Sequence, residues 1–193
     1  MFVPRTDIVV IVSGLAASGK STLSRQLAER LGVERYSGGE ALKAVAARKG
    51  YETSGNSWWE SEAGMQFLAM REENESLDRM VDEELLSIAR RGGVVIDSWV
   101  LPWLFDGGFK IWLKADKAVR AARLAKRAGL SLEEALKILE ERDTRNAELY
   151  RRLYGFRLGS DLEPFHLILD TSRLGSHEVL EIVYTSVKYY FDL

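Results

Sequence analysis

Short apolar runs alternate along this chain with longer stretches in which apolar residues recur every three or four positions. The runs have the length of buried β-strands, and the recurrence is that of helices with one apolar face. Strands are predicted at residues 8–12, 33–36, 94–97, 109–113 and 166–169. Helices are predicted at residues 22–31, 41–49, 58–71, 77–91, 116–127, 132–147 and 177–187, with a loop rich in turn-forming residues at 50–57.

The run from Val94 to Ile96 has no polar position before it ends at Asp97. Such a run suits a central parallel strand that helices cover on both faces. Because strands and helices alternate throughout, the pattern predicts an α/β fold of three layers, with a parallel sheet of about five strands between helices. Helix N-caps are predicted at Ser37, at Ser131 with Glu134 at the N3 position, and at Ser176, and the last helix should bury Val179, Ile182, Val183 and Val187.

The first apolar run leads into a glycine-rich segment with the spacing G-x-x-x-x-G-K-S, from Gly14 to Ser21. Gly14 and Gly19 allow a tight turn that aims successive backbone N–H groups into one concavity, and the following helix adds the positive end of its dipole. Lys20 supplies a cation for the β- and γ-phosphates, and the Ser21 hydroxyl a ligand for Mg²⁺. The loop residues expected around the phosphates are Gly14, Ala16, Ala17, Ser18, Gly19, Lys20, Ser21 and Thr22.

A glycine-rich surface turn is the alternative interpretation of this segment. The flanking sequence argues against a surface turn, because β-branched residues precede the loop, and Leu23, Leu27 and Leu31 form a helical apolar stripe after it. Binding of a nucleoside triphosphate is therefore predicted.

Polar residues follow the predicted strands where ligands collect in such sheets. Asp97 comes directly after an apolar strand and is placed to hold Mg²⁺ together with Ser21, although capping of a turn is an alternative role. Thr171 and Ser172 follow the last strand and are expected near the nucleotide.

A second candidate site is cationic. Arg120, Arg123 and Arg127 are spaced to share one helix face, and Arg142 and Arg145 follow in the next predicted helix. Phosphoryl transfer uses such charges, because negative charge spreads over the oxygens of the transferred group. The alternative is a solvated face whose arginines pair with nearby acidic residues, namely Glu133, Glu134, Glu140 and Glu141.

Four large apolar residues of the 58–71 segment could either stack on a base or belong to the core, which is the more common fate of such residues. They are Trp58, Trp59, Phe67 and Met70. His166 and His177 have no partner at metal-ligand spacing, so neither is expected to bind a metal or to act in catalysis.

Composition narrows the class of protein. A length of 193 residues with 46% hydrophobic content fits one domain with a sizeable core. The net charge of −2 argues against a nucleic-acid partner, and the absence of cysteine excludes disulfides. With no long apolar run and no signal-peptide pattern, we expect a cytoplasmic protein without a membrane partner, acting as a monomer on small nucleotides.

Taken together, these motifs resemble nucleoside monophosphate kinases, and most closely the archaeal type of cytidylate kinase. The resemblance covers nearly the whole chain. Beyond the phosphate loop it rests on residues 110–115, Arg120, Arg123, Lys126, Arg127, residues 133–136, Arg142, Asp143, Tyr150, Tyr154, Gly155 and residues 169–172.

The resemblance implies one kinase domain over residues 1–193 that transfers the γ-phosphoryl group of ATP, with Mg²⁺, to CMP or dCMP. Its core would be residues 1–36, 92–119 and 148–193, its acceptor-binding segment residues 37–91, and its mobile lid about residues 120–147. Catalytic roles are expected for Lys20, Arg123, Arg127 and Arg142, and acceptor binding for Ser37, Gly39, Lys43, Asp78, Asp97, Trp99 and Arg145.

Two positions depart from the family where the acceptor phosphate should bind. The family has arginines where this chain has Lys43 and Trp99. Lys43 keeps the charge but loses the bidentate geometry, and Trp99 keeps neither. Kinase action on a different small-molecule or RNA hydroxyl, and nucleotide binding without appreciable kinase activity, therefore remain alternatives.

Overall fold

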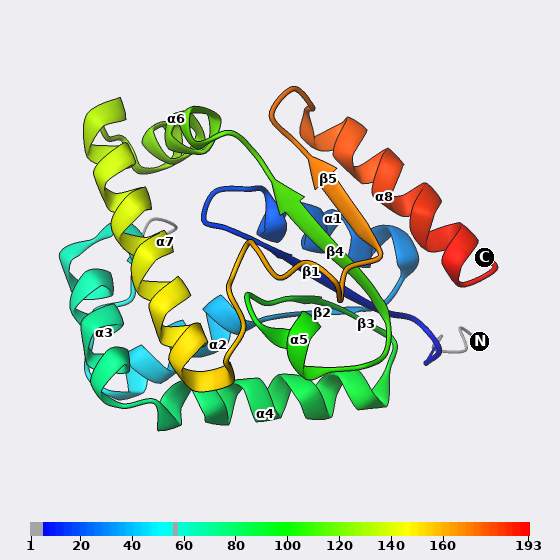
Figure 1. Ribbon diagram of the computed structural model, residues 1–193, viewed down its shortest axis with the longest axis horizontal. Helices are drawn as coiled ribbons and strands as arrows, with labels where there is room; N and C mark the ends of the chain where they lie inside the picture. Colours follow the sequence, from blue (N-terminus) through cyan, green and yellow to red (C-terminus); the bar gives the residue numbers. More distant parts are fainter. Residues whose placement is uncertain (1–5, 56–57) are drawn as a thin grey trace.

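The computed structural model describes residues 6–55 and 58–193 (Figure 1). Residues 1–5 of the predicted core and residues 56–57 of the predicted loop lie outside this part. Five strands form one sheet in which all neighbours are parallel, in the order β2-β3-β1-β4-β5. The strands are β1 (Val9–Gly14), β2 (Glu34–Ser37), β3 (Val94–Asp97), β4 (Phe109–Lys114) and β5 (Leu167–Asp170). This confirms the predicted parallel sheet.

Alternate residues of β1 point into two separate layers, as the period of a strand requires. Val9 and Ile11 belong to a core cluster shared with α2 (Gly38–Arg48), α3 (Glu62–Glu73) and α4 (Ser76–Arg91). Val10 and Val12 pack on the other face against α1 (Lys20–Leu31) and α8 (Ser176–Tyr190). All six residues of β1 are buried. The predicted three layers are therefore confirmed.

Helices α6 (Lys117–Ala128) and α7 (Leu132–Tyr154) lie at the carboxyl end of the sheet, whereas the single turn α5 (Leu101–Leu104) contacts β1 and α4 (Figure 1). The α6 and α7 pair contains the segment predicted as the lid. Among the helices of residues 6–55 and 58–193, none has the length and apolar character needed to cross a membrane.

Two predicted helices differ most from the structure, and one short helix was not predicted. The segment 58–71 begins as a 3₁₀ turn (Trp58–Glu60), because the Ser61 hydroxyl accepts a hydrogen bond from the Gly64 N–H and starts α3 afresh. Helix α7 continues past residue 147 to Tyr154, since its last turns bury Leu149, Tyr150 and Leu153 in a core cluster. The turn α5 was not predicted, because four residues are too few to show a helical period.

The predicted N-caps at Ser37 and Ser131 are confirmed, and Ser131 with Glu134 forms a reciprocal capping box. The N-cap of α8 is Gly175, so the prediction for Ser176 is wrong by one residue. Ile182 is also wrongly placed in the core. Its side chain is 39% exposed, whereas Val179, Val183 and Val187 are buried as predicted.

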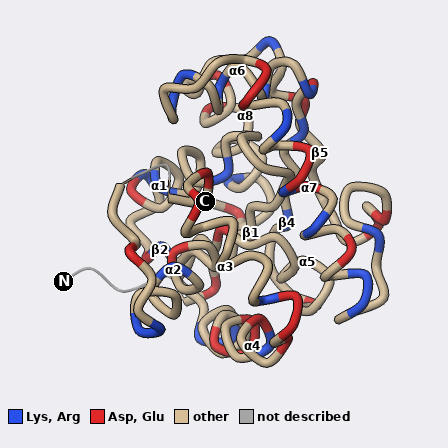
Figure 2. Tube along the Cα trace, turned by 90° about the vertical axis from the view of Figure 1, so that its left-hand side faces the viewer, with Lys and Arg blue, Asp and Glu red and all other residues tan. Residues whose placement is uncertain are grey.

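Charged residues of both signs are interspersed, for example along α4 (Figure 2). This distribution agrees with the small net charge of −2.

Candidate active site

The loop between β1 and α1 has the backbone of a phosphate cradle. Gly14 has φ +147°, and a Cβ there would lie 2.3 Å from the Leu113 carbonyl oxygen, so no other residue fits without displacing β4. Gly19 has φ +107° and is the N-cap of α1, with no side chain to bond the first N–H groups of the helix. Ser18 Oγ is buried without a hydrogen-bond partner among the described residues. The first N–H groups of α1 and the Ser18 hydroxyl can therefore donate hydrogen bonds to a phosphate group. The positive end of the α1 dipole favours the same negatively charged group.

Lys20 lies inside this loop. Its Nζ donates a hydrogen bond of 2.9 Å to the Leu15 carbonyl oxygen and lies 4.9 Å from the centroid of the Trp99 ring. Burial lowers the pKa of Lys20 to about 8, and the nearby Asp97 carboxylate opposes this shift. The ammonium is therefore poorly solvated. A charged phosphate oxygen would be a stronger hydrogen-bond acceptor for it than the neutral Leu15 carbonyl.

Ser21 and Asp97 meet at the carboxyl end of the sheet. Parallel pairing places Asp97 beside Val12 of β1, and Ser21 Oγ donates a hydrogen bond of 2.6 Å to Asp97 Oδ2. A hydroxyl and a buried carboxylate are oxygen donors of the kind Mg²⁺ prefers. Within the described ranges no group of three His, Cys, Asp or Glu residues could hold a metal. Phosphate oxygens and water would therefore have to complete any magnesium site here.

Replacing Asp97 by Asn tests this placement. The amide keeps an acceptor for the Ser21 hydroxyl but loses the negative charge. We expect the Mg²⁺ concentration for half-maximal activity to rise between about tenfold and a hundredfold, with little change in melting temperature. A titration of activity against Mg²⁺, together with thermal unfolding, measures both. A large fall in melting temperature with an unchanged Mg²⁺ requirement would contradict a role in metal binding.

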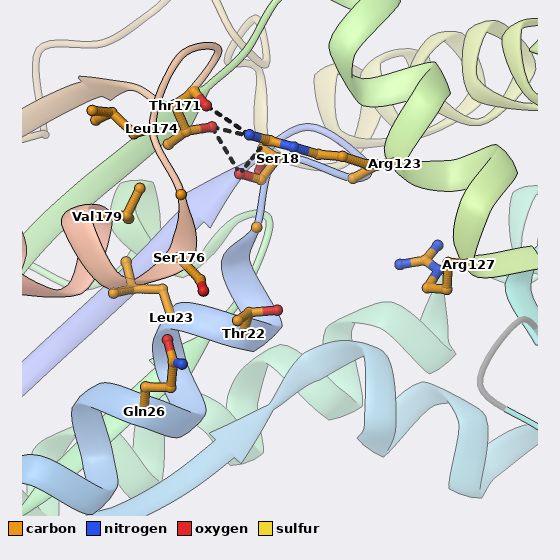
Figure 3. A pocket seen from close by; sticks show the side chains of 13 residues that line it. Ser18, Thr22, Leu23, Gln26, Arg123, Arg127, Thr171, Leu174, Ser176 and Val179 are labelled. Carbon is orange, nitrogen blue, oxygen red and sulfur yellow. Dashed lines mark hydrogen bonds between the residues drawn. The ribbon is translucent and has the colours of Figure 1, made fainter.

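One cavity, of about 360 Å³, lies beside the phosphate loop, between α1, α6 and the segment that joins β5 to α8 (Figure 3). Leu23, Leu174 and Val179 give it an apolar wall. Arg123 borders it and donates hydrogen bonds to the Thr171 hydroxyl at 3.0 Å and to the Thr171 carbonyl at 2.6 Å. This shape and lining fit the nucleoside half of a triphosphate bound in the loop.

A second cavity, of about 410 Å³, has Lys20 in its wall and is strongly cationic. A third, smaller cavity of about 60 Å³ adjoins it, and Gly39, Trp59, Trp99 and Arg142 line both. The second cavity is lined by residues that include Lys20, Ser21, Ser37, Gly39, Lys43, Asp97, Trp99, Arg127 and Arg142. These two adjoining cavities, where an acceptor is expected, are called the acceptor chamber below.

Arginines of α6 and α7 form part of the wall of this chamber. Arg127 and Arg142 both donate to the same carboxylate oxygen of Glu60, at 2.8 Å for Arg127. Arg120 and Asp143 form an ion pair of 2.7 Å that also bonds both backbone groups of Ala16 in the phosphate loop. The segment predicted as the lid is thus bonded both to the phosphate loop and to Glu60 of the segment predicted to bind the acceptor.

The alternative of a solvated arginine face is wrong for Arg120, which is 5% exposed. Arg123 is likewise partly buried and bonded to Thr171. Of the acidic residues proposed as partners, Glu140 pairs with Lys117 instead, whereas Glu141 pairs with Arg145 of the same cluster, as that alternative predicted.

Some predicted site residues line neither the acceptor chamber nor the cavity beside the phosphate loop. Both carboxylate oxygens of Asp78 accept hydrogen bonds from Arg71, and Arg145 pairs with Glu72 and Glu141 outside the acceptor chamber. Ser172 does not line the first cavity, the one beside the phosphate loop, although Thr171 does, and the Ser172 hydroxyl accepts a hydrogen bond of 2.9 Å from the Asp116 N–H at the start of α6. The roles assigned to these three residues remain predictions.

Sequence analysis missed several residues of the site. Glu60, Arg71, Asp82 and Asn146 were given no role, and Asp143 was noted only as part of a family motif, whereas Arg120 was included in the cationic cluster. The spacing of Arg120 with Arg123 and Arg127 was a usable signal for the lid. No signal in the sequence marks Asp82 or Asn146, because their importance depends on which cavity they line.

The aromatic residues of the acceptor segment divide between the two predicted roles. Trp58 and Phe67 are buried in the core, as the more common alternative predicted, and Met70 packs against the same cluster. Trp59 lines the acceptor chamber. His166 Nδ1 accepts a hydrogen bond of 3.0 Å from the Lys110 N–H, which gives this histidine a structural partner.

A phosphate loop at the end of a parallel sheet, with two cavities that meet beside it at Thr22 and Arg127, is typical of a P-loop kinase. The shikimate kinase of Acinetobacter baumannii, solved in complex with shikimate, shares the fold at a TM-score of 0.58, with 17% identity and 96% of each chain covered.

Residues 9–173 match the cytidylate kinase-like family, and the chain belongs to it. The cytidylate kinase of Pyrococcus horikoshii is 35% identical over 95% of this chain and 90% of its own length. That of Aeropyrum pernix is 35% identical over 90% of this chain and 95% of its own length. The chain is thus a kinase of the nucleoside monophosphate kinase class.

Proposed function

We propose that this enzyme transfers the γ-phosphoryl group of ATP, in the presence of Mg²⁺, to CMP or dCMP. The observation that carries the proposal is the pair of cavities on opposite sides of the phosphate loop, which meet at Thr22 and Arg127. A donor in one cavity and an acceptor in the other can place the acceptor oxygen in line with the transferred phosphorus.

The donor would bind with its phosphates in the loop and its nucleoside against Leu23, Leu174 and Val179. Lys20 would then exchange the Leu15 carbonyl for the β- and γ-phosphate oxygens. Mg²⁺, held through Ser21 and Asp97, would neutralise phosphate charge. Arg123 would lie along the phosphates, since its guanidinium already reaches the Ser18 carbonyl at 3.5 Å.

The acceptor phosphate would be held where the second cavity gathers Lys43, Arg127 and Arg142. Arg127 lines both the donor and the acceptor cavity, which places it beside the group in transfer. Because the two arginines share one oxygen of Glu60, an arriving phosphate dianion can compete for them with that single carboxylate.

Trp99 stands where the family's second arginine is expected, and the structure gives it another partner. Its ring contacts the Lys20 ammonium on one side and lines the base end of the chamber on the other. A cation–π contact lets Trp99 orient Lys20 without adding a second positive charge beside it. We therefore propose that Lys43, Arg127 and Arg142 bind the acceptor phosphate without a residue-99 cation.

A screen of acceptors tests this function. Purified protein with ATP and Mg²⁺ is offered each ribo- and deoxyribonucleoside monophosphate, and shikimate as a hydroxyl acceptor. We expect CMP and dCMP to give the highest kcat/KM, with one ADP formed for each CDP or dCDP. Turnover of shikimate but of no nucleoside monophosphate would contradict the proposal and would favour the hydroxyl-acceptor alternative.

A further inference from the structure

A buried network of charged and hydroxyl groups closes the far end of the acceptor chamber. It joins Arg71 of α3, Asp78 and Asp82 of α4, and Tyr150 and Tyr154 of α7. Arg71 donates to both oxygens of Asp78 and, at 3.1 Å, to the Tyr150 hydroxyl. The Tyr154 hydroxyl donates a hydrogen bond of 2.7 Å to Asp82 Oδ2. Three helices therefore fix this end of the chamber.

The two carboxylates of the network differ in whether both of their oxygens are hydrogen-bonded. Asp78 has both oxygens bonded and does not line the cavity. Asp82 is 8% exposed and lines the cavity, and in the part of the chain that the structure describes no hydrogen bond reaches its Oδ1. Asp82 therefore has a carboxyl oxygen without a protein partner at the wall of the narrow end of the chamber.

Other polar groups of the same cavity complement this oxygen. Arg71 lines the cavity, and its Nη1 makes no hydrogen bond to any described residue. Asn146 also lines it, with its amide nitrogen bonded to the Arg142 carbonyl at 2.7 Å and its amide oxygen unbonded among the described residues. The chamber thus offers a carboxyl group and a guanidinium donor beyond the phosphate-binding end, at the position a nucleobase would reach.

Resting on the function proposed above, we propose that Asp82 is the residue that selects cytosine over uracil in the acceptor. Cytosine carries an amino group at C4, which donates hydrogen bonds, whereas uracil carries a carbonyl oxygen there. An ionised Asp82 accepts from the cytosine amino group and repels the uracil oxygen. Arg71 donates to the ring nitrogen and carbonyl of cytosine, which are acceptors, but meets an N–H at that nitrogen in uracil.

The protonation state of Asp82 should then set the strength of this selection. Burial raises the pKa of Asp82 to about 7, and Asp78 of the same helix adds to the increase. Tyr154 of α7 and Arg71 of α3 oppose it, and Arg142 of α7 lines the same cavity. Below this pKa the carboxyl group carries a proton that it can donate to the C4 oxygen of uracil. The preference for CMP over UMP should therefore increase as the pH rises through the pKa.

The test is the ratio of CMP to UMP affinity, measured by calorimetry between about pH 6 and about pH 8. Titration of Lys20 and of the acceptor phosphate affects both ligands and cancels in the ratio. We expect the wild-type ratio to rise by about tenfold over this range and to reach between about tenfold and a hundredfold at the upper end. Asp82→Asn, whose amide can donate or accept, should give a ratio near one at every pH.

Tyr154→Phe is the matched control, because it keeps the ring and the Asp82 carboxyl but removes the hydrogen bond that favours the ionised form. The rise of the ratio should occur at higher pH in this variant. A wild-type ratio that is independent of pH, or an Asp82→Asn ratio equal to that of wild type, would overturn the inference. Selective binding without turnover would contradict the proposed function alone, and turnover of CMP with an unaltered Asp82→Asn ratio would contradict only the role of Asp82.

Discussion

Substitution of Lys20 by Met should lower phosphoryl transfer by about a thousandfold or more while the protein stays folded. The Lys20 ammonium lines the second cavity beside the phosphate loop, where the transferred group would lie, and a fixed cation where charge develops stabilises the transition state more than the ground state. Methionine preserves the length of the side chain and removes the charge. Because the Lys20 charge is desolvated in the unliganded protein, its loss should not destabilise the fold.

Steady-state kcat with ATP and CMP, together with thermal unfolding, measures this effect. Lys126→Met is the matched control, since Lys126 is an exposed lysine of α6 that lines neither cavity. The control should keep wild-type activity. Turnover of Lys20→Met within tenfold of wild type would contradict the assignment of the phosphate loop.

Substitution of Arg71 by Met should destabilise the protein by about 3–5 kcal/mol, which is the cost of leaving a buried carboxylate without its partner. The side chains of Arg71 and Asp78 are each 2% exposed, so water cannot replace the lost hydrogen bonds. Tyr150 loses a donor at the same time. Chemical denaturation gives the free energy of unfolding.

Two further variants distinguish the effect of breaking a buried ion pair from the effect of replacing any arginine by methionine. The double variant Arg71→Met with Asp78→Leu removes both charges and should recover much of the stability. Arg30→Met breaks an exposed pair with Glu181 and should leave the free energy of unfolding nearly unchanged. A loss in Arg71→Met no larger than in Arg30→Met would show that the buried network does not stabilise the acceptor segment.

The phosphate loop could be predicted because its constraints are local. Gly14 and Gly19 adopt backbone conformations that other residues disfavour, and Lys20 and Ser21 follow at fixed spacing. The positions of the strands and the layers also follow from patterns that each segment carries by itself. These parts of the fold need no knowledge of distant contacts.

The acceptor chamber could not be predicted in the same detail. Residues of the same type that are close in sequence there have different roles, because they contact different residues in the folded chain. Asp78 and Asp82 are one helical turn apart on the same face of α4, yet Arg71 bonds both oxygens of Asp78, whereas Asp82 Oδ1 has no hydrogen-bond partner among the described residues. Trp58 and Trp59 are adjacent, yet one is core and the other lines the cavity. Such differences arise from packing between helices that are distant in sequence.

The length of α7 has the same origin. No helix-breaking residue occurs between residue 147 and Gly155, but the polar residues in this stretch weaken the apolar period. Contacts of Leu149 and Leu153 with a core cluster decide that the helix continues. Tertiary packing therefore overrides a weak local signal.

The central claim is transfer of the γ-phosphoryl group of ATP to the phosphate of CMP, and a single-turnover experiment tests it most directly. Enzyme in excess over ATP labelled in the γ-phosphate is mixed with Mg²⁺ and CMP, and the products are separated. The account predicts that the label appears in the β-phosphate of CDP, and that Lys20→Met abolishes its appearance within the same time. Label that stays in ATP, or that is released only as inorganic phosphate, would contradict the account.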